Sequence, residues 1–215
     1  MYCLTTYWCW RHSNLTTMGR RSLKDARQKE IIEVFYQIAK QEGLENASLA
    51  KTAELAGMNP SLIIHYFKTR EQLVYGLIEF ILDRYLQIFN VPASDNSTPK
   101  TVLLKIIDNV FSKKWNVLFD DSVSYSCYAL ALRDETIAGR YRQLLETLRK
   151  SMEQYIRACK KEGLLQVTNA AMTADLIFVL VDGAYYYLSL VNDEKEYAAG
   201  LKRYKKQAIA LLNFV

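Results

Sequence analysis

The chain has 215 residues, half of them hydrophobic, and a formal net charge of +5. This suits one domain or two small ones with a hydrophobic core, and no apolar run approaches the roughly 18 residues of a membrane span. Only three prolines and eight glycines favour long helices over a β-sandwich or barrel, and the mild charge permits DNA as a partner without requiring it.

Residues 1–17 lack the basic start and the continuous apolar stretch of a signal peptide. We expect Met18 to open the functional protein, and residues 1–22 to form an extension with a disordered start. A basic arm before the first helix would contain Arg20, Arg21, Lys24 and Arg27. Such an arm could follow the phosphate backbone of DNA or enter its minor groove, and the alternative is a solvated tail.

Three helices are predicted before residue 67. Apolar residues at helical spacing indicate the first over 27–41, and Gly43 ends it. Ser48 is the expected N-cap of the second, which ends at Gly57. The third begins at Asn59-Pro60, because asparagine caps helices and proline is tolerated at the first position, and it extends to about Tyr66.

Thr69 and Gln72 form a capping box for a fourth helix, which extends to about Phe89. The third helix is too short to be stable alone, so neighbouring helices must hold it. A helix, a glycine turn and a short helix form a helix-turn-helix, whose second helix offers its first residues to the major groove. We therefore expect a DNA-binding domain over 23–69.

The polar stretch 91–99 is the clearest break in the chain. After this stretch, Thr98-Pro99 begins a helix, and another helix is expected at about 121–132. A strand over 123–129 is the weaker alternative, because this segment alternates slightly between polar and apolar residues.

Three further helices follow. A long amphipathic helix begins at about 135 and ends before Gly163. Segment 174–191 is apolar almost all round, which predicts a helix buried on most sides. The last helix begins at Asn192 or Asp193 and extends to about Phe214. The expected fold is all-α with about nine helices, and residues 70–215 form a second, helical-bundle domain for ligand binding and dimerisation.

The span from about Arg27 to Leu82 resembles the DNA-binding domain of the TetR family of bacterial transcriptional repressors. The resemblance is carried by Phe35, Gly43 and the stretches SLAKTAELAGMNPSLIIHYF (48–67) and KTREQL (68–73). Ile64 and Arg70 depart from the family's pattern, in which an aromatic residue and a lysine are common at these places.

By position, this resemblance implies DNA contacts for Ser48, Asn59, Pro60, Ser61 and Leu62, and phosphate or groove contacts for His65, Tyr66, Lys68, Thr69 and Arg70. Hydroxyl groups, N–H groups and cations suit phosphate oxygens, and Leu62 could touch a thymine methyl group. The alternatives are that Asn59 is only a cap, and that His65 and Tyr66 pack under the fourth helix.

The stretches FDDSVSYSCYALALRDETIAGRY (119–141) and ADLIFVLVDGAYYYLSL (174–190) resemble the ligand-binding domain of the TetR branch that contains the choline-responsive betaine regulator. Candidate residues of an effector pocket are the aromatic residues of this half: Trp115, Phe119, Tyr125, Tyr128, Tyr155, Phe178, Tyr185 and Tyr186. Stacked tyrosine and tryptophan faces would suit a quaternary amine, and the alternative is an ordinary core.

The expected function is a cytoplasmic repressor that a small-molecule effector releases from a double-stranded DNA operator. Segment 174–191 and the last helix should pair with their copies in a homodimer, because two half-sites about 34 Å apart are read by two copies. No membrane partner is expected. A non-specific architectural DNA binder is the alternative, and it would bind unrelated duplexes almost equally.

An enzyme is a further alternative, but the sequence offers little material for it. The two histidines and four cysteines have no catalytic or metal-binding spacing, so we predict no catalytic residue, no metal site and no cofactor. Asp120 and Asp121 are adjacent and cannot face one another on a helix. The cysteines are interpreted as reduced thiols of a cytosolic protein.

Overall fold

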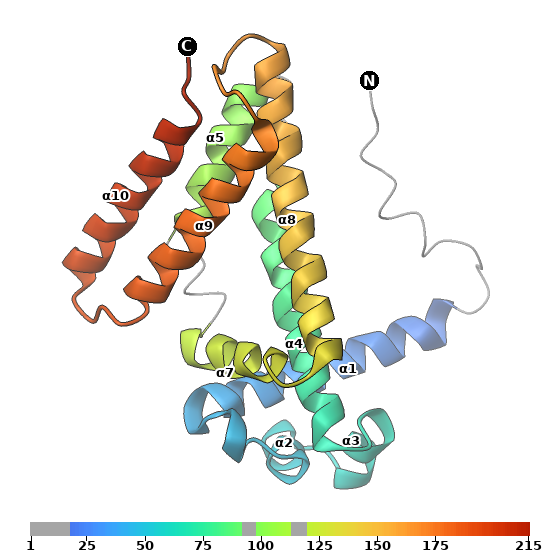
Figure 1. Cartoon of the computed structure of the whole chain (residues 1–215). Helices are drawn as coiled ribbons and strands as arrows, with labels where there is room; N and C mark the ends of the chain where they lie inside the picture. The colour runs from blue at the N-terminus through green and yellow to red at the C-terminus, as the bar shows by residue number, and fades with distance from the viewer. Residues whose placement is uncertain (1–17, 92–97, 113–119) are drawn as a thin grey trace. The chain divides into compact units, whose positions relative to one another are not determined.

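The computed structural model describes residues 18–91, 98–112 and 120–215, with side chains from residue 23 onward. Within these ranges it has nine α-helices and no strand beyond one isolated bridge, which confirms the all-α fold (Figure 1). The helices are α1 (Met18–Glu42), α2 (Leu49–Ala56), α3 (Pro60–Tyr66), α4 (Arg70–Leu86), α5 (Pro99–Val110), α7 (Asp121–Ala131), α8 (Glu135–Lys161), α9 (Ala170–Leu188) and α10 (Glu194–Leu211). Single 3-10 turns are η2 (Leu44–Asn46) and η3 (Gln87–Phe89).

The chain forms two compact units, and the boundary between Leu77 and Ile78 lies inside α4. The N-terminal unit contains α1, α2, α3 and the first part of α4. The C-terminal unit contains the rest of α4 and all later helices. The domain boundary expected from the sequence, between residues 69 and 70, lies at the beginning of the same helix.

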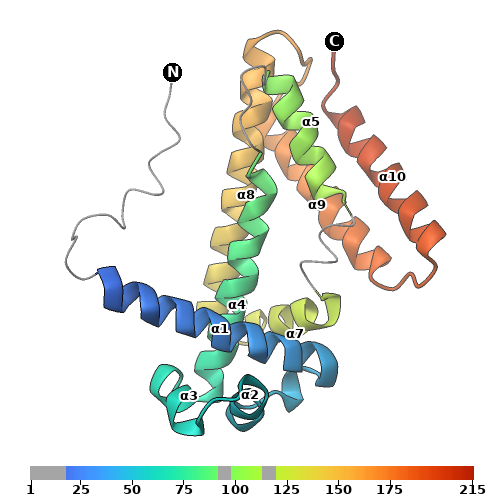
Figure 2. The ribbon, with the colours of Figure 1, turned by 180° about the vertical axis from the view of Figure 1, so that it is seen from behind.

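The N-terminal unit surrounds a small apolar core. In it, α1 packs against η2 and α2, and α2 packs against α3 (Figure 2). Each helix contributes fully buried side chains, such as Phe35 from α1, Ala53 from α2, Ile63 from α3 and Leu73 from α4. These buried side chains form the core that holds the unit together.

Helix α1 begins nine positions earlier than the apolar stripe predicted, at Met18 instead of Arg27. The basic residues expected as an arm before the first helix are therefore part of α1. Arg27 forms an ion pair of 2.6 Å with Glu30, one turn later. A solvated helix tolerates such cations because neighbouring carboxylates compensate for them. The side chains of Arg20 and Arg21 lie outside the described residues.

The predicted caps of α2 and α3 are present. The Ser48 hydroxyl accepts a hydrogen bond of 3.3 Å from the Lys51 N–H, and the Asn59 carboxamide oxygen accepts one of 2.9 Å from the Ser61 N–H. Gly57 ends α2 in the left-handed conformation, with φ 61°. These local interactions stop one helix and begin the next within a few residues.

The capping box of α4 differs from the prediction by one residue. The Thr69 hydroxyl accepts from the Gln72 N–H at 3.4 Å, as expected. The Gln72 side chain, however, accepts from the Lys68 N–H at 2.8 Å instead of from the N–H of Thr69. The capping hydrogen bonds of α4 therefore also include Lys68, the loop residue before Thr69.

In the C-terminal unit, α8 packs against α5, α7 and α9, and α10 packs against α5 and α9 (Figure 1). Its core includes Ile106 from α5, Met152 and Ile156 from α8, and Ile177 from α9. The segment 121–131 is helical, so the strand alternative is wrong. Asp120 caps this helix by accepting from two N–H groups, which favours the helical conformation at its first turn.

Helix α9 is less buried in the single chain than the sequence predicted. One of its faces packs against α8 and α10, while Met172, Leu176, Val179 and Tyr186 remain exposed. The prediction of burial on most sides is therefore wrong for one copy. Among the described helices only α9 is long and apolar enough to cross a membrane, and 33% of its apolar segment is buried. Core helices of soluble proteins can have the same length and composition.

Replacing Gly57 by alanine should destabilise the N-terminal unit by about 1–2 kcal/mol, because a Cβ is unfavourable in the left-handed conformation. A Cβ would meet no atom within 4 Å, so the cost is conformational and not a clash. Gly57→Asn should lose less, since asparagine tolerates this conformation. Urea unfolding followed by circular dichroism measures both.

The control is Gly139→Ala in α8, where a Cβ also meets open space. Alanine favours a helix interior, so this variant should be as stable as the parent protein or more stable. Equal stability of Gly57→Ala and the parent would show that the turn between α2 and α3 does not need a left-handed residue.

Candidate nucleic-acid interface and ligand cavity

Helix α3 is anchored by one face and exposed on the other. Ile63 is fully buried, whereas Ile64 is 52% and Leu62 36% exposed. Ser61 and His65 are exposed as well. The outer face of this short helix is thus not covered by its own unit, which is the condition that a groove-binding helix must meet.

Asn59 caps α3, and its side chain also keeps hydrogen-bond donors available for a partner. Its carboxamide oxygen accepts from the Ser61 N–H and, at 2.8 Å, from the Ser61 hydroxyl. Its NH₂ group forms no hydrogen bond with the described residues, and the side chain is exposed. Pro60 follows at the first helical position, also exposed. The two interpretations of Asn59, as a cap and as a DNA contact, are therefore compatible.

The other predicted contact residues differ in their exposure. Lys24 of α1, Lys68 and Thr69 are exposed, and Ser48 is half-buried. Tyr66 is half-buried, and its ring meets the exposed His65 ring edge to face at 5.2 Å. Packing inside the unit therefore involves Tyr66 more than His65.

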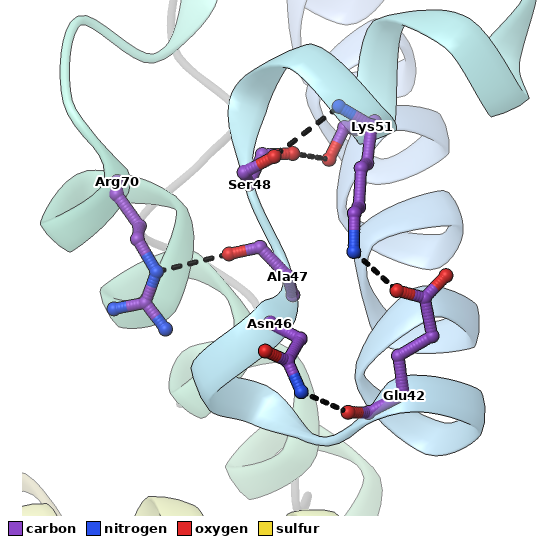
Figure 3. A network of polar contacts seen from close by, with 7 residues as sticks. Glu42, Asn46, Ala47, Ser48, Lys51 and Arg70 are labelled. Atoms are coloured by element: carbon purple, nitrogen blue, oxygen red, sulfur yellow. Dashed lines mark hydrogen bonds and ion pairs between the residues drawn. The ribbon is translucent and has the colours of Figure 1, made fainter.

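Arg70 is bonded within the protein. Its Nε donates to the Ala47 carbonyl at 2.9 Å (Figure 3). Its Nη2 donates to the Leu44 carbonyl. The side chain is half-buried at the beginning of α4. The two bonds join α4 to the loop before α2, so this arginine has a structural role beside the DNA contact that the resemblance implies.

A second set of contacts holds the same loop to α1. Lys51 forms an ion pair with Glu42, and the Asn46 side chain donates to the Glu42 carbonyl at 2.7 Å (Figure 3). The buried Thr52 hydroxyl donates to the Ser48 carbonyl at 2.7 Å. The loop before α2 is thus hydrogen-bonded both to α1 and to α4. These bonds fix the position of α2, which packs against α3.

The C-terminal unit contains a cavity of about 510 Å³, within the range of small-molecule sites. Five predicted pocket residues line it: Tyr125, Tyr128, Phe178, Tyr185 and Tyr186. Tyr155 is not among the lining residues, and its ring stacks on the Phe89 ring with their centroids 6.5 Å apart. Trp115 and Phe119 lie outside the described residues.

Several polar residues of the cavity wall were not predicted as site residues, namely Tyr85, Asp121, Ser124, Tyr141 and Asp182. Tyr141 lies among the buried residues of α8, which follow helical spacing, and this spacing does not distinguish a core residue from a cavity wall. Asp182 gave a clearer signal, since it interrupts the apolar run of α9.

The hydroxyl groups of the wall differ in their partners. The Tyr185 hydroxyl donates to the Val110 carbonyl at 2.7 Å. The Tyr141 hydroxyl is buried and has no hydrogen-bond partner among the described residues. A buried unpaired hydroxyl is unfavourable.

Burial determines the protonation of these groups. It raises the pKa of Tyr85 to about 12, and the charge of Asp121 adds to this effect. Burial also raises the pKa of Asp121, with a further contribution from Asp120. The pKa of Asp182 is likewise raised by burial, while Arg149 opposes the shift. The Asp182 side chain is still 56% exposed, so contact with solvent limits this rise in its pKa.

The fold and the two sites together define a DNA-binding transcription regulator with a helix-turn-helix and a separate helical domain that holds a ligand cavity. The family described as "Tetracyclin repressor-like, C-terminal domain" matches residues 98–214, more than half of the chain. The protein belongs to the TetR family of transcriptional regulators.

Relatives and solved structures agree with this assignment. The chain is 23% identical over 168 residues to the nucleoid occlusion factor SlmA of Cronobacter sakazakii, covering 76% of this chain and 83% of that protein. It is 24% identical over 195 residues to the transcriptional regulator BetI of Brucella anthropi, covering 86% and 92%. A TetR regulator from Haloarcula marismortui has the same fold, with a TM-score of 0.74 and 18% identity over 89% of this chain and 100% of that one.

Replacing Arg70 by lysine should destabilise the N-terminal unit by about 2 kcal/mol, because a single ammonium group cannot reproduce both carbonyl bonds. The charge is kept, so a simple phosphate contact would survive. The control is Lys68→Met, which removes an exposed charge two residues away and should leave stability unchanged. Urea unfolding of both variants is the measurement. Unchanged stability of Arg70→Lys would refute the structural role.

Proposed function

We propose that this TetR-family regulator is a homodimeric repressor, which leaves its operator when a small molecule fills the cavity of the C-terminal unit. The observation that carries the proposal is the anchored but uncovered helix α3, with Ile63 inside and the opposite face exposed. A major groove accepts a rigid, exposed helix that a preceding helix holds in place.

The candidate DNA-contact residues divide by chemistry into two groups. Asn59 and Ser61 present hydrogen-bonding groups for base edges or phosphate, and Leu62 presents an apolar surface for a thymine methyl group. Phosphate contacts are assigned to the remaining candidates, Arg20, Arg21, Lys24, Ser48, Pro60 through its neighbouring backbone, His65, Tyr66, Lys68, Thr69 and Arg70. These contacts set the register, and the base contacts determine the sequence that is bound.

Dimerisation is assigned to the exposed face of α9, supported by α10. Met172, Leu176 and Val179 lie on one side of α9 at helical spacing, and Tyr186 and Leu190 extend the same apolar surface. A patch of this kind is typical of an interaction surface, and a two-fold pair of α9 helices would cover it.

Helix α4 is the proposed connection between effector and DNA. Its Ile81 and Tyr85 line the cavity, and its first residue, Arg70, is bonded to the loop before α2. A ligand that shifts α4 would therefore move the support of α3. The coupling free energy equals the ligand's preference for one arrangement over the other.

No catalytic step is proposed for this protein. Burial raises the pKa of Cys127 to about 12 and that of Cys159 to about 11, so both free thiols stay protonated at neutral pH. They are poor nucleophiles in this state. Reduced buried thiols and a DNA partner are consistent with the cytoplasm, which we propose as the location.

Selection of bound fragments from genomic DNA should yield a pseudo-palindromic site, which the purified protein binds about a thousandfold or more tightly than random duplex. Asn59→Ala should reduce this ratio by losing a base or register contact. Lys68→Ala should weaken both kinds of complex and lower the salt dependence by about one phosphate contact. Equal affinity for operator and random DNA would favour the architectural alternative.

Val179→Glu should convert the dimer to a monomer, because it places a charge at the centre of the apolar face of α9. Light scattering coupled to size exclusion measures the mass, and operator binding should fall with it. The control is Leu132→Glu, which changes another exposed leucine, 74% accessible after α7, and should remain a dimer. A dimeric Val179→Glu protein would contradict the α9 interface.

A further inference from the structure

Helix α3 carries no side chain of the types that pair with a base through two hydrogen bonds. Its seven residues are PSLIIHY, without lysine, arginine, asparagine, glutamine or a carboxylate. The most frequent specific contacts in the major groove are arginine or lysine on guanine and asparagine or glutamine on adenine. The helix itself can form none of them.

The cap residue Asn59 does not supply such a contact either, because its oxygen is engaged. The carboxamide oxygen accepts from the Ser61 N–H at 2.9 Å and from the Ser61 hydroxyl at 2.8 Å. These two bonds use both lone pairs of the oxygen. Asn59 can therefore donate to a base, but it cannot also accept from one, as the paired recognition of adenine requires.

The exposed surface of α3 is instead largely apolar. Ile64 is 52% exposed, more than Leu62 at 36%. Successive residues of a helix are about 100° apart around its axis, so these two side chains lie on opposite flanks of the buried Ile63. Pro60 lies one turn before Ile64 on the same flank and is exposed as well. The flank that carries Ile64 therefore presents hydrocarbon groups to a partner.

This chemistry limits what Ile64 can contact on DNA. A hydrocarbon side chain forms no hydrogen bond with a phosphate oxygen, and covering a phosphate with it would remove water without replacement. The apolar group that the bases offer in the major groove is the methyl group of thymine. Contact between this methyl group and a branched side chain removes two apolar surfaces from water, which is favourable.

We propose that Ile64 is a specificity-determining residue that contacts the methyl group of a thymine in each operator half-site. Because the methyl group belongs to one strand only, this contact also distinguishes T·A from A·T. Ile64 is one of the positions at which the chain departs from the TetR pattern, so the contact is a property of this chain. The inference deepens the DNA interface of the proposed function and rests on it.

The test uses uracil, which differs from thymine only by the missing methyl group. A duplex library with a randomised core is prepared once with thymidine and once with deoxyuridine, and the full chain selects sequences from both. Base pairing is the same in the two libraries, so positions read through hydrogen bonds should be enriched equally. A thymine position in each half-site should be enriched from the first library and more weakly from the second.

Single replacements then locate the methyl group. Each thymine of the selected duplex is changed to uracil in turn, and fluorescence anisotropy measures the dissociation constant. Loss of the methyl contact should weaken binding about fourfold in one half-site and more than tenfold in both. A scan in which every replacement leaves the affinity unchanged would contradict methyl recognition.

The variant Ile64→Ala removes the proposed contact and keeps the helix. The residue is half exposed and alanine is the better helix former, so the variant should fold. The thymine and uracil duplexes should become equally good ligands at the position located by the scan. The control is Leu86→Ala, which truncates an exposed leucine of α4 and should keep the difference seen with the parent protein. An unchanged difference in Ile64→Ala would refute the role of Ile64.

The matched variant within α3 is Leu62→Ala. Because Leu62 lies on the other flank, this variant should keep the full methyl effect at the position where Ile64→Ala abolishes it. Loss of the same effect in both variants would show that each acts through the placement of the whole helix. The assignment to Ile64 would then fail.

The selection also separates this inference from the proposed function. If neither library yields a consensus and the protein binds random duplexes equally, sequence-specific DNA binding fails, and the inference fails with it. If both libraries yield the same pseudo-palindromic consensus with equal enrichment, operator binding stands and only the role of Ile64 fails.

Discussion

A helix of seven residues cannot be stable on its own, and α3 has seven. Its conformation therefore depends on contacts that lie outside it. Ile63 and the following Phe67 are buried in the N-terminal unit, and the Gly57 turn and the Asn59 cap determine where the helix begins. Because these contacts use one side only, the same arrangement that stabilises α3 leaves its other side for a partner. Stability and exposure have a common origin here.

Helix α4 has a comparable double role. Its beginning is bonded to the loop before α2 through Arg70, and its later part carries Tyr85 in the cavity wall. Between them, Glu79 accepts from Arg140 of α8 at 2.7 Å. A bidentate arginine–carboxylate pair resists sliding of one helix along the other. A ligand that acts through α4 must therefore work against this contact.

Local chemistry could be predicted from the sequence, and long-range contacts could not. Ser48 and Asn59 were identified as caps, and Thr98-Pro99 as a helix start, because these signals need only neighbouring residues. The bonds of Arg70 to carbonyls more than twenty residues earlier have no local pattern, so this residue was interpreted as a DNA contact alone. Tyr141 was hidden for a similar reason, since a cavity wall and a core share the same helical period.

The proposed dimer surface and the cavity wall both include residues of helix α9, so the two are not independent. Asp182, Gly183 and Tyr186 line the cavity, yet Tyr186 is also 67% exposed and adjoins the apolar face that includes Val179. A Cβ at Gly183 would meet no atom within 4 Å, so a partner helix could approach closely at that point. A second copy on this face would therefore lie beside residues that line the cavity, so the proposed dimer surface and the cavity share one helix.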